Sequence, residues 1–474
     1  MRYKSSCTKQ GTLPSVFGGG LKTNLYIIRL VSCIFVAVLC VSCGSDVKTA
    51  PKTPAKADAV IVFFTGNGLG KLKPCGCSGG QLGGLSRRST IFNRVSEDKR
   101  LIIDTGSLVE GQSEQDVIKF NITLQAYGLL DYDLVNLSEE DIETGKNVGL
   151  LDDTDSLFNI ISYQQSSDVD VPAKFARSLL LRDKPVLVTV AAFDAKSTPI
   201  EQIGQLFASG VNPVQVDSKS KVNILILNHC DDTIIDFITK KVPVVDCIVR
   251  PSESDEPRVA GGLNNKPLVF SVGRFGRYVS GLQITESPAY KGKPRLSFIT
   301  IKVKEELEED AVLVQLYKGY QQIVGERNLL EKYQRFVLPG NLEYTGSESC
   351  KGCHEYEYDK WGQQAHAHAY PTLERVGSQL DPECVSCHVV GMEYESGFVS
   401  EQKSSQMKNV GCENCHGPGS EHIRTEGDTA LTEPKSGCID CHTPEHSGEY
   451  AGNEGDFLEK IVHWREPSTS GSVK

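Results

Sequence analysis

The sequence predicts an α/β domain, then a long helix, then a small domain made mainly of helices and loops. In the first part of the chain, short apolar runs alternate with longer mixed segments, as in an α/β sheet that is covered on both faces. Apolar residues then recur at helical spacing. Nine of the ten histidines lie beyond residue 350, and the length of 474 residues allows two or three domains.

The first 43 residues are predicted to be an export signal. Five positively charged residues precede an uncharged, mostly apolar run at 30–42, and the first acidic residue is Asp46. The run is too short to cross a hydrocarbon core of about 30 Å as a helix, which takes roughly 20 residues. It suits the apolar region of a signal peptide. It ends in a stretch that resembles a bacterial lipobox, so Cys43 is the candidate lipidation site. A plain cleaved signal and a retained membrane anchor are the alternatives.

A tether follows the signal, because residues 48–57 consist only of Lys, Pro, Thr and Ala. We therefore expect a signal with its lipobox at 1–43, a disordered tether at 44–57, the α/β domain at 58–303, a helical connector at 304–343 and the histidine-rich domain at 344–474.

Seven apolar runs are the predicted strands of the α/β domain: 60–64, 101–103, 134–135, 186–190, 224–227, 244–249 and 268–272. The connector is predicted from apolar residues at helical spacing between Leu307 and Tyr333, and its tyrosines are expected to pack rather than to carry radicals. Sheets of this class place their sites in the loops that follow the strand ends, so the function of the α/β domain is sought there.

Four Cys-x-x-Cys-His pentads stand in the last part of the chain. They are Cys350, Cys353 and His354; Cys384, Cys387 and His388; Cys412, Cys415 and His416; and Cys438, Cys441 and His442. This pentad is the attachment signature of a c-type haem, because two thiols add to the porphyrin vinyl groups and the adjacent histidine reaches the iron. The sequence predicts four covalently bound haems. Two structural zinc sites are the alternative, but they leave four histidines at the same offset unexplained.

Five further histidines are candidates for the opposite faces of the irons. The chain has only three methionines, so we expect mostly bis-histidine ligation, which generally gives lower potentials than His/Met. The preferred sixth ligands are His366, His368, His422 and His463, and His446 is the predicted spare. An iron without a sixth ligand would be open to a small molecule.

The last domain has little chain for each haem. Residues 344–474 give roughly 33 residues per haem, too few for an ordinary core. The porphyrins are therefore expected to form the core, in a domain that does not fold without them and that conducts electrons. This segment carries 10 Lys and Arg against 22 Asp and Glu, and the whole chain has a net charge of -11. That balance favours a basic docking partner and excludes a nucleic-acid binder.

Residues from about 344 to 465 resemble the tetrahaem cytochromes c that accept electrons from hydroxylamine oxidation in nitrifying bacteria. The matching stretches are 344–350, Trp361 with 363–369, 410–422 and 461–463. The resemblance implies distal ligands at His366 or His368, at His422 and at His463. One member type has a five-coordinate haem, which the nearly full supply of histidines does not favour here.

Residues 58–285 resemble the 5′-nucleotidase branch of the calcineurin-like metallophosphatases, in the order of the loops at 65–70, 75–85, 104–107, 136–139, 228–230 and 250–253. Most of the metal ligands that the resemblance implies are replaced. Several of the family's metal-ligand positions are occupied here by other residues, namely Asn67, Leu69, Ser107, Leu137 and Ser138. Residues 250–253 stand where the family has a Gly-His-x-His motif. Only Asp104 and His229 lie near expected positions, and a two-metal site needs more ligands, so an inactive metallophosphatase-like sandwich is expected.

Cysteines occur in or near these loops instead. Cys75 and Cys77 follow the first strand, Cys230 follows His229 at another strand end, and Cys247 lies inside a strand. Three interpretations stay open: structural disulfides, an additional soft-metal site built from Cys75, Cys77, His229 and Cys230, and a thiol redox centre that passes electrons to the haems.

The leading hypothesis is an exported tetrahaem c-type cytochrome, a periplasmic or cell-surface lipoprotein that transfers electrons between a redox protein and another acceptor. It is held at the membrane by its lipid anchor, and its α/β domain is a docking or sensing platform. The alternative is a multihaem oxidoreductase that acts on a small nitrogen or sulfur compound at a Cys site or an open haem. A metal-dependent phosphohydrolase is the weaker alternative.

Overall fold

The computed structural model describes residues 59–74, 80–147, 149, 158–163, 171–196, 198–208, 221–251, 254–261, 267–286, 293–432, 437–443, 446–447 and 449–463. All of them belong to the compact unit Pro54–Lys474. The predicted signal, Cys43 and the tether lie outside the described residues, as do Cys75 and Cys77.

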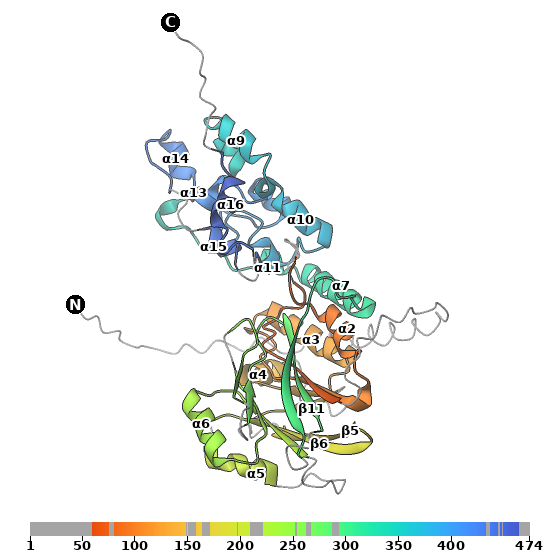
Figure 1. Cartoon of the computed structure of the whole chain (residues 1–474). Coiled ribbons are helices and arrows are strands. Elements are labelled where there is room, and N and C mark those ends of the chain that lie inside the picture. The colour runs from red at the N-terminus through yellow and green to blue at the C-terminus, as the bar shows by residue number, and fades with distance from the viewer. Residues whose placement is uncertain are drawn as a thin grey trace, which may run out of the picture. The chain divides into compact units, whose positions relative to one another are not determined.

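The first sheet has six strands in the order β12-β11-β1-β2-β3-β4. Their bounds are β1 Ala59–Thr65, β2 Arg100–Asp104, β3 Leu134–Asn136, β4 Asn159–Ile161, β11 Tyr278–Thr285 and β12 Arg295–Lys302. Strands β1 to β4 run parallel, whereas β11 pairs antiparallel with both β1 and β12. The sheet is therefore mixed, with its parallel half built from the early part of the chain (Figure 1).

The second sheet has the order β5-β6-β7-β8-β10-β9. Its strands are β5 Lys174–Leu181, β6 Lys184–Phe193, β7 Lys221–Leu227, β8 Cys247–Val249, β9 Val259–Gly261 and β10 Leu268–Phe270. Strands β6, β7, β8 and β10 are parallel, and antiparallel strands β5 and β9 lie at the two ends. Each of the seven predicted runs overlaps a strand, but β4, β5, β9, β11 and β12 lie outside these runs.

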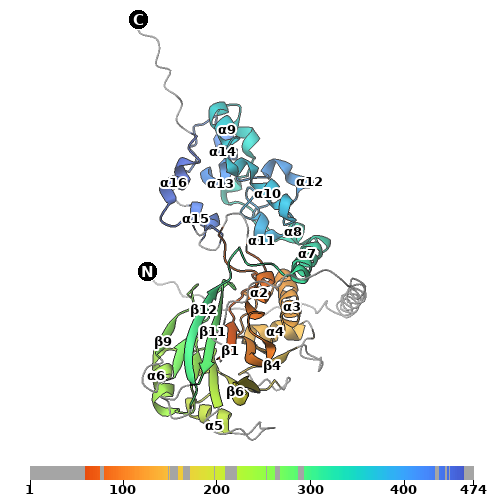
Figure 2. The same ribbon diagram turned by 45° about the vertical axis from the view of Figure 1, so that its right-hand side comes forward.

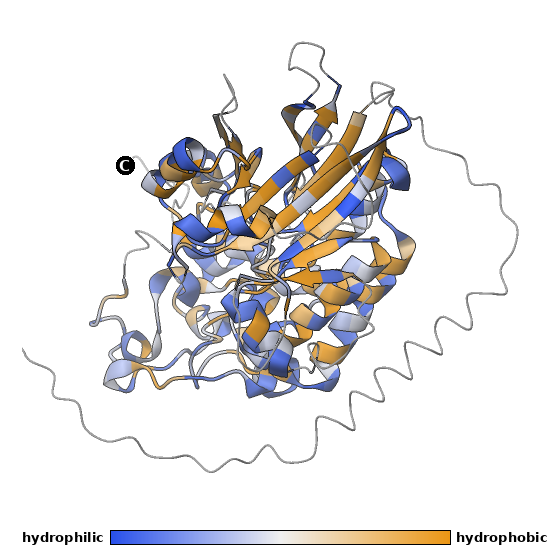
Figure 3. Cartoon of the chain, turned by 90° about the horizontal axis from the view of Figure 1, so that it is seen from below, coloured by the Kyte–Doolittle hydropathy of each residue, from blue (hydrophilic) through white to orange (hydrophobic). Residues whose placement is uncertain are grey.

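The two sheets pack against each other through alternating side chains. Val60, Val62 and Phe64 of β1 share one buried cluster with Val188 and Ile224 of the second sheet. Because successive strand residues face opposite sides, Ile61 and Phe63 point the other way, into a cluster with helices α2, α3 and α7. A third cluster lies between the second sheet and helices α5 and α6. The predicted α/β sandwich is confirmed, and its strands are largely apolar (Figure 3).

The helices of the α/β part and connector are η2 Leu85–Arg87, α2 Arg88–Phe92, η3 Glu97–Lys99, α3 Glu114–Leu129, α4 Glu139–Asn147, η5 Ile200–Gln202, α5 Ile203–Ala208, α6 Asp232–Lys241, α7 Ala311–Glu326, α8 Leu329–Lys332 and η8 Pro339–Asn341. Helix α7 begins where Asp310 Oδ1 accepts hydrogen bonds from the backbone N–H groups of Val312 and Leu313.

The connector helix is shorter than predicted. Helix α7 ends at Glu326, and Asn328 has a left-handed φ of 54° before the short helix α8. A left-handed residue ends a helix because it turns the chain away from the helical path. The sequence predicted a helix between Leu307 and Tyr333, but both of these residues lie outside α7 and α8. Tyr320 is buried against the first sheet's helix layer, as expected for a packing residue.

The C-terminal region consists of short helices and loops (Figure 2). They are η9 Ser347–Cys350, α9 Glu355–Trp361, η10 Ala365–His368, α10 Ala369–Val376, α11 Pro382–Val385, α12 Glu401–Ser404, η11 Ser405–Met407, α13 Cys412–His416, α14 Ser420–Arg424, α15 Cys438–Cys441 and α16 Glu454–Glu459. One small apolar cluster is found here, around Tyr370 and Phe398. Within the described residues, no helix has the length and apolar character needed to cross a membrane.

Candidate functional site

The four pentads lie at short helical turns of the C-terminal region. Cys350 ends η9 and Cys384 lies in α11, while the third pentad forms α13 and the cysteines of the fourth form α15. Residues three positions apart share one side of a helix. In α13 and α15 the two thiols of a pentad therefore lie on one side, with the histidine directly after them.

Three pentad histidines face a second histidine from elsewhere in the chain. The ring centres of His354 and His422 lie 6.1 Å apart, those of His366 and His442 6.2 Å apart, and those of His416 and His463 6.2 Å apart. The second member of each pair comes from a loop or helix far from the pentad in sequence. The fold thus brings together three pairs of histidines that are far apart in the sequence.

The spacing of these pairs suits an iron held between two imidazoles. A metal–nitrogen bond is about 2 Å long and each ring nitrogen lies about 1 Å from its ring centre, so two rings on one metal are about 6 Å apart. Covalent haem c, which the pentads imply, therefore fits the donor set of this region: two thiols and two facing imidazoles for each of these three pentads.

Backbone carbonyls orient several of the rings. His422 Nδ1 donates to the carbonyl of Thr429 at 2.7 Å, and His463 Nδ1 donates to that of Ile461 at 2.9 Å. His442 Nδ1 contacts Ser447 Oγ at 3.0 Å. A metal-binding histidine generally uses its second ring nitrogen in such a bond, which fixes the tautomer. A metal held by these rings would therefore be bound through Nε2.

Burial favours the neutral form of the paired histidines. It lowers the pKa of His366, and the charge of His442 lowers it further. Burial also lowers the pKa of His416, against a hydrogen bond to Thr432 that raises it. The neutral imidazole is the form that binds a metal, so this environment suits ligation.

The remaining pentad histidine, His388, has a similar orientation. Its Nδ1 donates to the carbonyl of Ala369 at 2.7 Å. Burial lowers the pKa of His388, against the hydrogen bond to Ala369 that raises it, and the charge of His446 lowers it further. His446 Nδ1 contacts Thr443 Oγ1 at 3.0 Å.

His368 is placed differently from the other candidates. Its Nε2 donates to the carbonyl of Gly362 at 3.0 Å, and the side chain is exposed. Because the carbonyl can only accept, Nε2 carries the proton and has no lone pair for a metal. The structure therefore brings His366, and not His368, to a pentad histidine.

The pentad cysteines do not gather as a zinc site would require. All eight are described, and none of them forms a disulfide. Across the described ranges, no group of three or more His, Cys, Asp or Glu side chains could hold a metal ion.

The loops of the α/β part bring together few of the predicted residues. His229 Nδ1 contacts Asp194 Oδ1 at 3.1 Å. Burial raises the pKa of the Cys230 thiol to about 11 and also raises that of Cys247, which lies inside the core. Such thiols are not readily ionised. The proposed four-residue sulfur site also needs Cys75 and Cys77, which lie outside the described residues.

A small polar pocket lies at the strand ends where a metallophosphatase would bind metals. Its polar lining comes from Asn67, Thr105, Ser107, Asn228 and Arg250. None of these side chains is a carboxylate or an imidazole, the groups that a two-metal site uses. The lining agrees with the replaced ligands noted in the sequence.

Asp104, the acidic residue kept from the metallophosphatase pattern, is engaged in the core. Its Oδ2 accepts hydrogen bonds from Thr65 Oγ1 at 2.6 Å and from the Tyr127 hydroxyl at 2.7 Å, and its Oδ1 accepts one from Gly106 N at 2.9 Å. Burial raises the pKa of Asp104, and these bonds and the charge of Arg88 oppose that rise. The carboxylate is therefore a buried structural group.

Comparison with known proteins agrees with the C-terminal site. Residues 349–417 match the family model described as cytochrome c554 and c-prime. Cytochrome c-554 of Nitrosomonas europaea is 32% identical over 97 residues, which cover 17% of this chain and 41% of that protein. The chain thus spans less than half the length of this relative. With the pentads and the ring pairs, these matches support a multihaem c-type cytochrome in the C-terminal region.

Solved structures similar to the α/β region are nucleotidases and phosphoesterases, as the sequence resemblance predicted. The NAD nucleotidase of Haemophilus influenzae has a TM-score of 0.44 at 12% identity. The similarity covers 61% of this chain and 64% of the nucleotidase chain. The 5′-nucleotidase precursor of Thermus thermophilus has a TM-score of 0.43 at 14% identity. Here the similarity covers 59% of this chain and 61% of the other chain. The activities in these names are those of the other proteins.

Proposed function

We propose that this protein is an exported tetrahaem c-type cytochrome that transfers electrons between a redox protein and another acceptor. The observation that carries the proposal is the set of three histidine pairs with ring centres 6.1 to 6.2 Å apart. Each pair joins one pentad histidine to one histidine from outside the pentads. The family match to cytochrome c554 and c-prime over 349–417 supports the same function.

The residues have distinct tasks in this function. The two cysteines of a pentad would hold the haem covalently, and the pentad histidine and the facing histidine would bind its iron. When bound, haem c supplies an iron that takes up and releases single electrons. Two imidazoles on an iron favour a lower potential than one imidazole and a methionine. The chain's own contribution is to fix those imidazoles by bonds to Thr429, Ile461 and Ser447.

Charge and export complete the proposal. The segment 344–474 has more than twice as many acidic as basic residues, so its partner is a redox protein with a basic docking face. Covalent haem attachment takes place after export, which agrees with the signal-like residues 1–43 and with lipidation at Cys43. We place the protein at the periplasmic or outer face of a membrane, held by that lipid.

The test is a count of covalent haems. The purified full-length protein should carry four haems per chain, measured by intact mass and by the absorbance of denatured protein. The double variant Cys438→Ser, Cys441→Ser should carry three. Cys247→Ser changes a buried cysteine outside the pentads and is the matched control, expected to keep four. A wild-type protein with two or fewer covalent haems would overturn the proposal.

The enzymatic alternatives have less support from the structure. An oxidoreductase needs an iron with an open sixth position or a reactive thiol pair, and Cys75 and Cys77 lie outside the described residues. A phosphohydrolase needs metal ligands at the strand ends, where the pocket is lined by Asn67, Thr105, Ser107, Asn228 and Arg250. Electron transfer is therefore the function that the described side chains support best.

A further inference from the structure

We propose that Lys119 of the α/β part and Glu383 together set the reduction potential of the haem attached at Cys384. The inference rests on the proposed function, because it concerns one of the haems of that function. Neither Lys119 nor Glu383 is an attachment residue or a candidate iron ligand, so both act on the haem from outside its ligand set, as positioning residues. The α/β part thereby influences a haem that it does not bind.

Lys119 is a buried cation of the α/β part. It lies in α3, and its side chain is 5% exposed. The side chain passes close to Gly70, where an added Cβ atom would lie 3.1 Å from Lys119 Cδ. Gly70 has a left-handed φ of 75°, which glycine adopts without strain, and its N–H donates to the Leu108 carbonyl at 2.6 Å. The loop after β1 therefore covers the lysine side chain and shields it from water.

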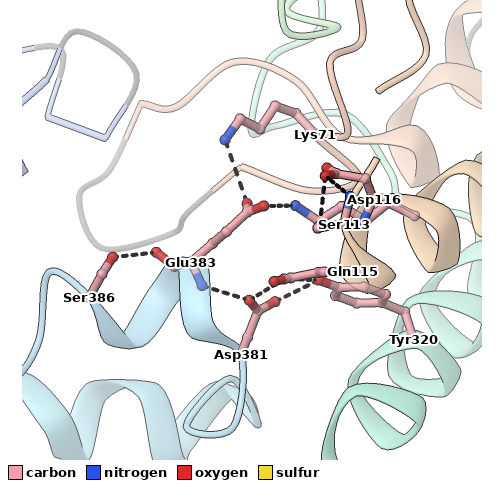
Figure 4. A network of polar contacts seen from close by, with 9 residues as sticks. Lys71, Ser113, Gln115, Asp116, Tyr320, Asp381, Glu383 and Ser386 are labelled. Carbon is pink, nitrogen blue, oxygen red and sulfur yellow. Dashed lines mark hydrogen bonds and ion pairs between the residues drawn. The ribbon is translucent and has the colours of Figure 1, made fainter. Parts of the chain in front are cut away.

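The charge of Lys119 is directed at the C-terminal region. Its ammonium group forms an ion pair with one oxygen of the Glu383 carboxylate. Lys71 Nζ lies 3.8 Å from the other oxygen of that carboxylate (Figure 4). Partial burial raises the pKa of Glu383, but the charges of Lys119 and Lys71 lower it below its usual value. Glu383 is therefore ionised at neutral pH, as the partner of a buried ammonium group must be.

A second carboxylate fixes the helix that carries Cys384. Asp381 caps α11 by accepting a hydrogen bond from the backbone at the start of the helix. The same side chain accepts hydrogen bonds from Gln115 Nε2 at 2.7 Å and from the Tyr320 hydroxyl at 2.8 Å. Gln115 precedes Lys119 by four residues, so one face of α3 supplies both contacts. The start of α11 is therefore held in place beside the buried ammonium group.

The α/β part contacts the C-terminal region at a second place. Gln81 Nε2 donates to the His446 carbonyl at 3.0 Å. That carbonyl belongs to a turn in which the backbone N–H groups of His446 and Ser447 donate to the Thr443 carbonyl, at 3.1 and 2.8 Å. Two contacts, one at α11 and one at this turn, oppose rotation of the C-terminal region against α3.

The ion pair lies beside the point where the haem is attached, because Glu383 directly precedes Cys384 in the chain. Reduction of a haem iron adds one negative charge, so a nearby cation stabilises the reduced form and a nearby anion destabilises it. Charges that are shielded from water act more strongly than exposed ones, because solvent and salt screen them less. Lys119 therefore raises the potential of this haem, and Glu383 lowers it.

The experiment is a redox titration of the full-length holoprotein, followed by haem absorbance. Lys119→Met removes the buried cation and should shift one of the midpoint potentials to a lower value. Glu383→Gln removes the anion and should shift the same midpoint to a higher value. The double variant Lys119→Met, Glu383→Gln should give a smaller shift than either single variant, because the two charges oppose each other.

Opposite signs separate an electrostatic effect from a structural one. A change that only loosened α11 would shift the midpoint in one direction whichever charge was removed, and the double variant would shift it most. Lys119→Arg keeps the charge and should keep the wild-type midpoint. Lys240→Met is the matched control and should change no midpoint, because Lys240 is an exposed lysine that pairs with Asp236 of the same helix.

Two results would overturn the inference: shifts of the same sign in Lys119→Met and Glu383→Gln, and unchanged midpoints in both. If Lys119→Met loses haem, Lys71→Met replaces it, since Lys71 is the second cation on Glu383. A shift to a lower midpoint is again expected there, and its absence overturns the inference. Unchanged midpoints in a protein with four haems leave the proposed function intact, whereas a wild type with two or fewer haems rejects that function and this inference with it.

Discussion

The α/β part and the C-terminal region are built in opposite ways. The α/β part has three buried apolar clusters, two of them between sheets and helices and one between the two sheets. The C-terminal region has a single small cluster, which ends at Met407. Among the described residues after Met407, Tyr450 is the one buried apolar side chain. Each α/β element is covered by other elements of the chain, and the late segment is not.

The difference shows which part depends on its cofactor. A hydrophobic core stabilises a fold in proportion to the apolar area that it removes from water, and the segment beyond Met407 buries little. Its ordered features are polar, such as the Glu413 carboxylate, which accepts hydrogen bonds from the backbone N–H groups of Thr345, Gly346 and Gly419. Apolar porphyrin faces are the natural complement of such a segment.

Removing haem is the strongest test of this contrast. When the protein is expressed without haem attachment, residues 408–463 should lose their protection against hydrogen exchange, because this segment has no apolar core of its own that could replace the porphyrins. Strands β1, β2, β6 and β7 should keep theirs. Hydrogen-exchange mass spectrometry of the two forms measures both regions at once. Protection of 408–463 without haem would show that the contrast is wrong.

A change in the α/β core should have the next largest effect. Asp104→Ala should lower the free energy of unfolding of the α/β part by about 3 to 5 kcal/mol, because it leaves the buried Thr65 and Tyr127 hydroxyls and the Gly106 N–H without their acceptor. Urea unfolding followed by circular dichroism measures the loss. Asp236→Ala, an exposed residue of α6, is the control. A loss below about 1 kcal/mol would mean that Asp104 is not structural.

The smallest of the three effects depends on pH. Burial raises the pKa of Asp141 to about 6, although the N–H groups of Ser107, Leu108 and Ser138 oppose the rise. The unfolded value is about 3.9, so the folded state holds the proton more tightly. The contribution of Asp141 to stability is therefore largest below about pH 4 and falls as pH rises to about 6, by roughly 2 to 3 kcal/mol.

The variant Asp141→Asn should remove that part of the pH dependence. Urea unfolding of wild type and variant at pH 4 and pH 7 gives the difference. Glu140→Gln on the exposed side of the same helix should leave the wild-type dependence unchanged. If Asp141→Asn loses as much stability between these pH values as wild type does, another group is responsible.

The pentads and the histidines that face them could be named from the sequence, whereas the pairing of each pentad histidine with a facing histidine could not. Cys412, Cys415 and His416 are adjacent in sequence, so their joint chemistry follows from local spacing alone. The facing ring of His463 depends on the path of the chain over the intervening residues. His366 and His368 are two residues apart, and only the fold shows that one faces His442 while the other donates Nε2 to Gly362.

Prediction from the sequence has the same limit in the α/β part. The apolar runs that become β1, β2 and β7 are visible because strands buried on both faces are continuously apolar. Strand β12 and strand β5 carry exposed positions, so their alternation is weaker and they were not predicted. The replaced metal ligands could be read from sequence, but the engagement of Asp104 by Thr65 and Tyr127 depends on contacts that only the fold provides.

The bond between Gln81 and His446 joins residues 365 positions apart in the chain. Contacts of such long sequence separation require closure of a large loop and tend to form late. The sheets and the pentads between these two residues can be in place before this bond closes. The contact between Gln81 and the turn of His446 is therefore expected to be among the last to form as the chain folds.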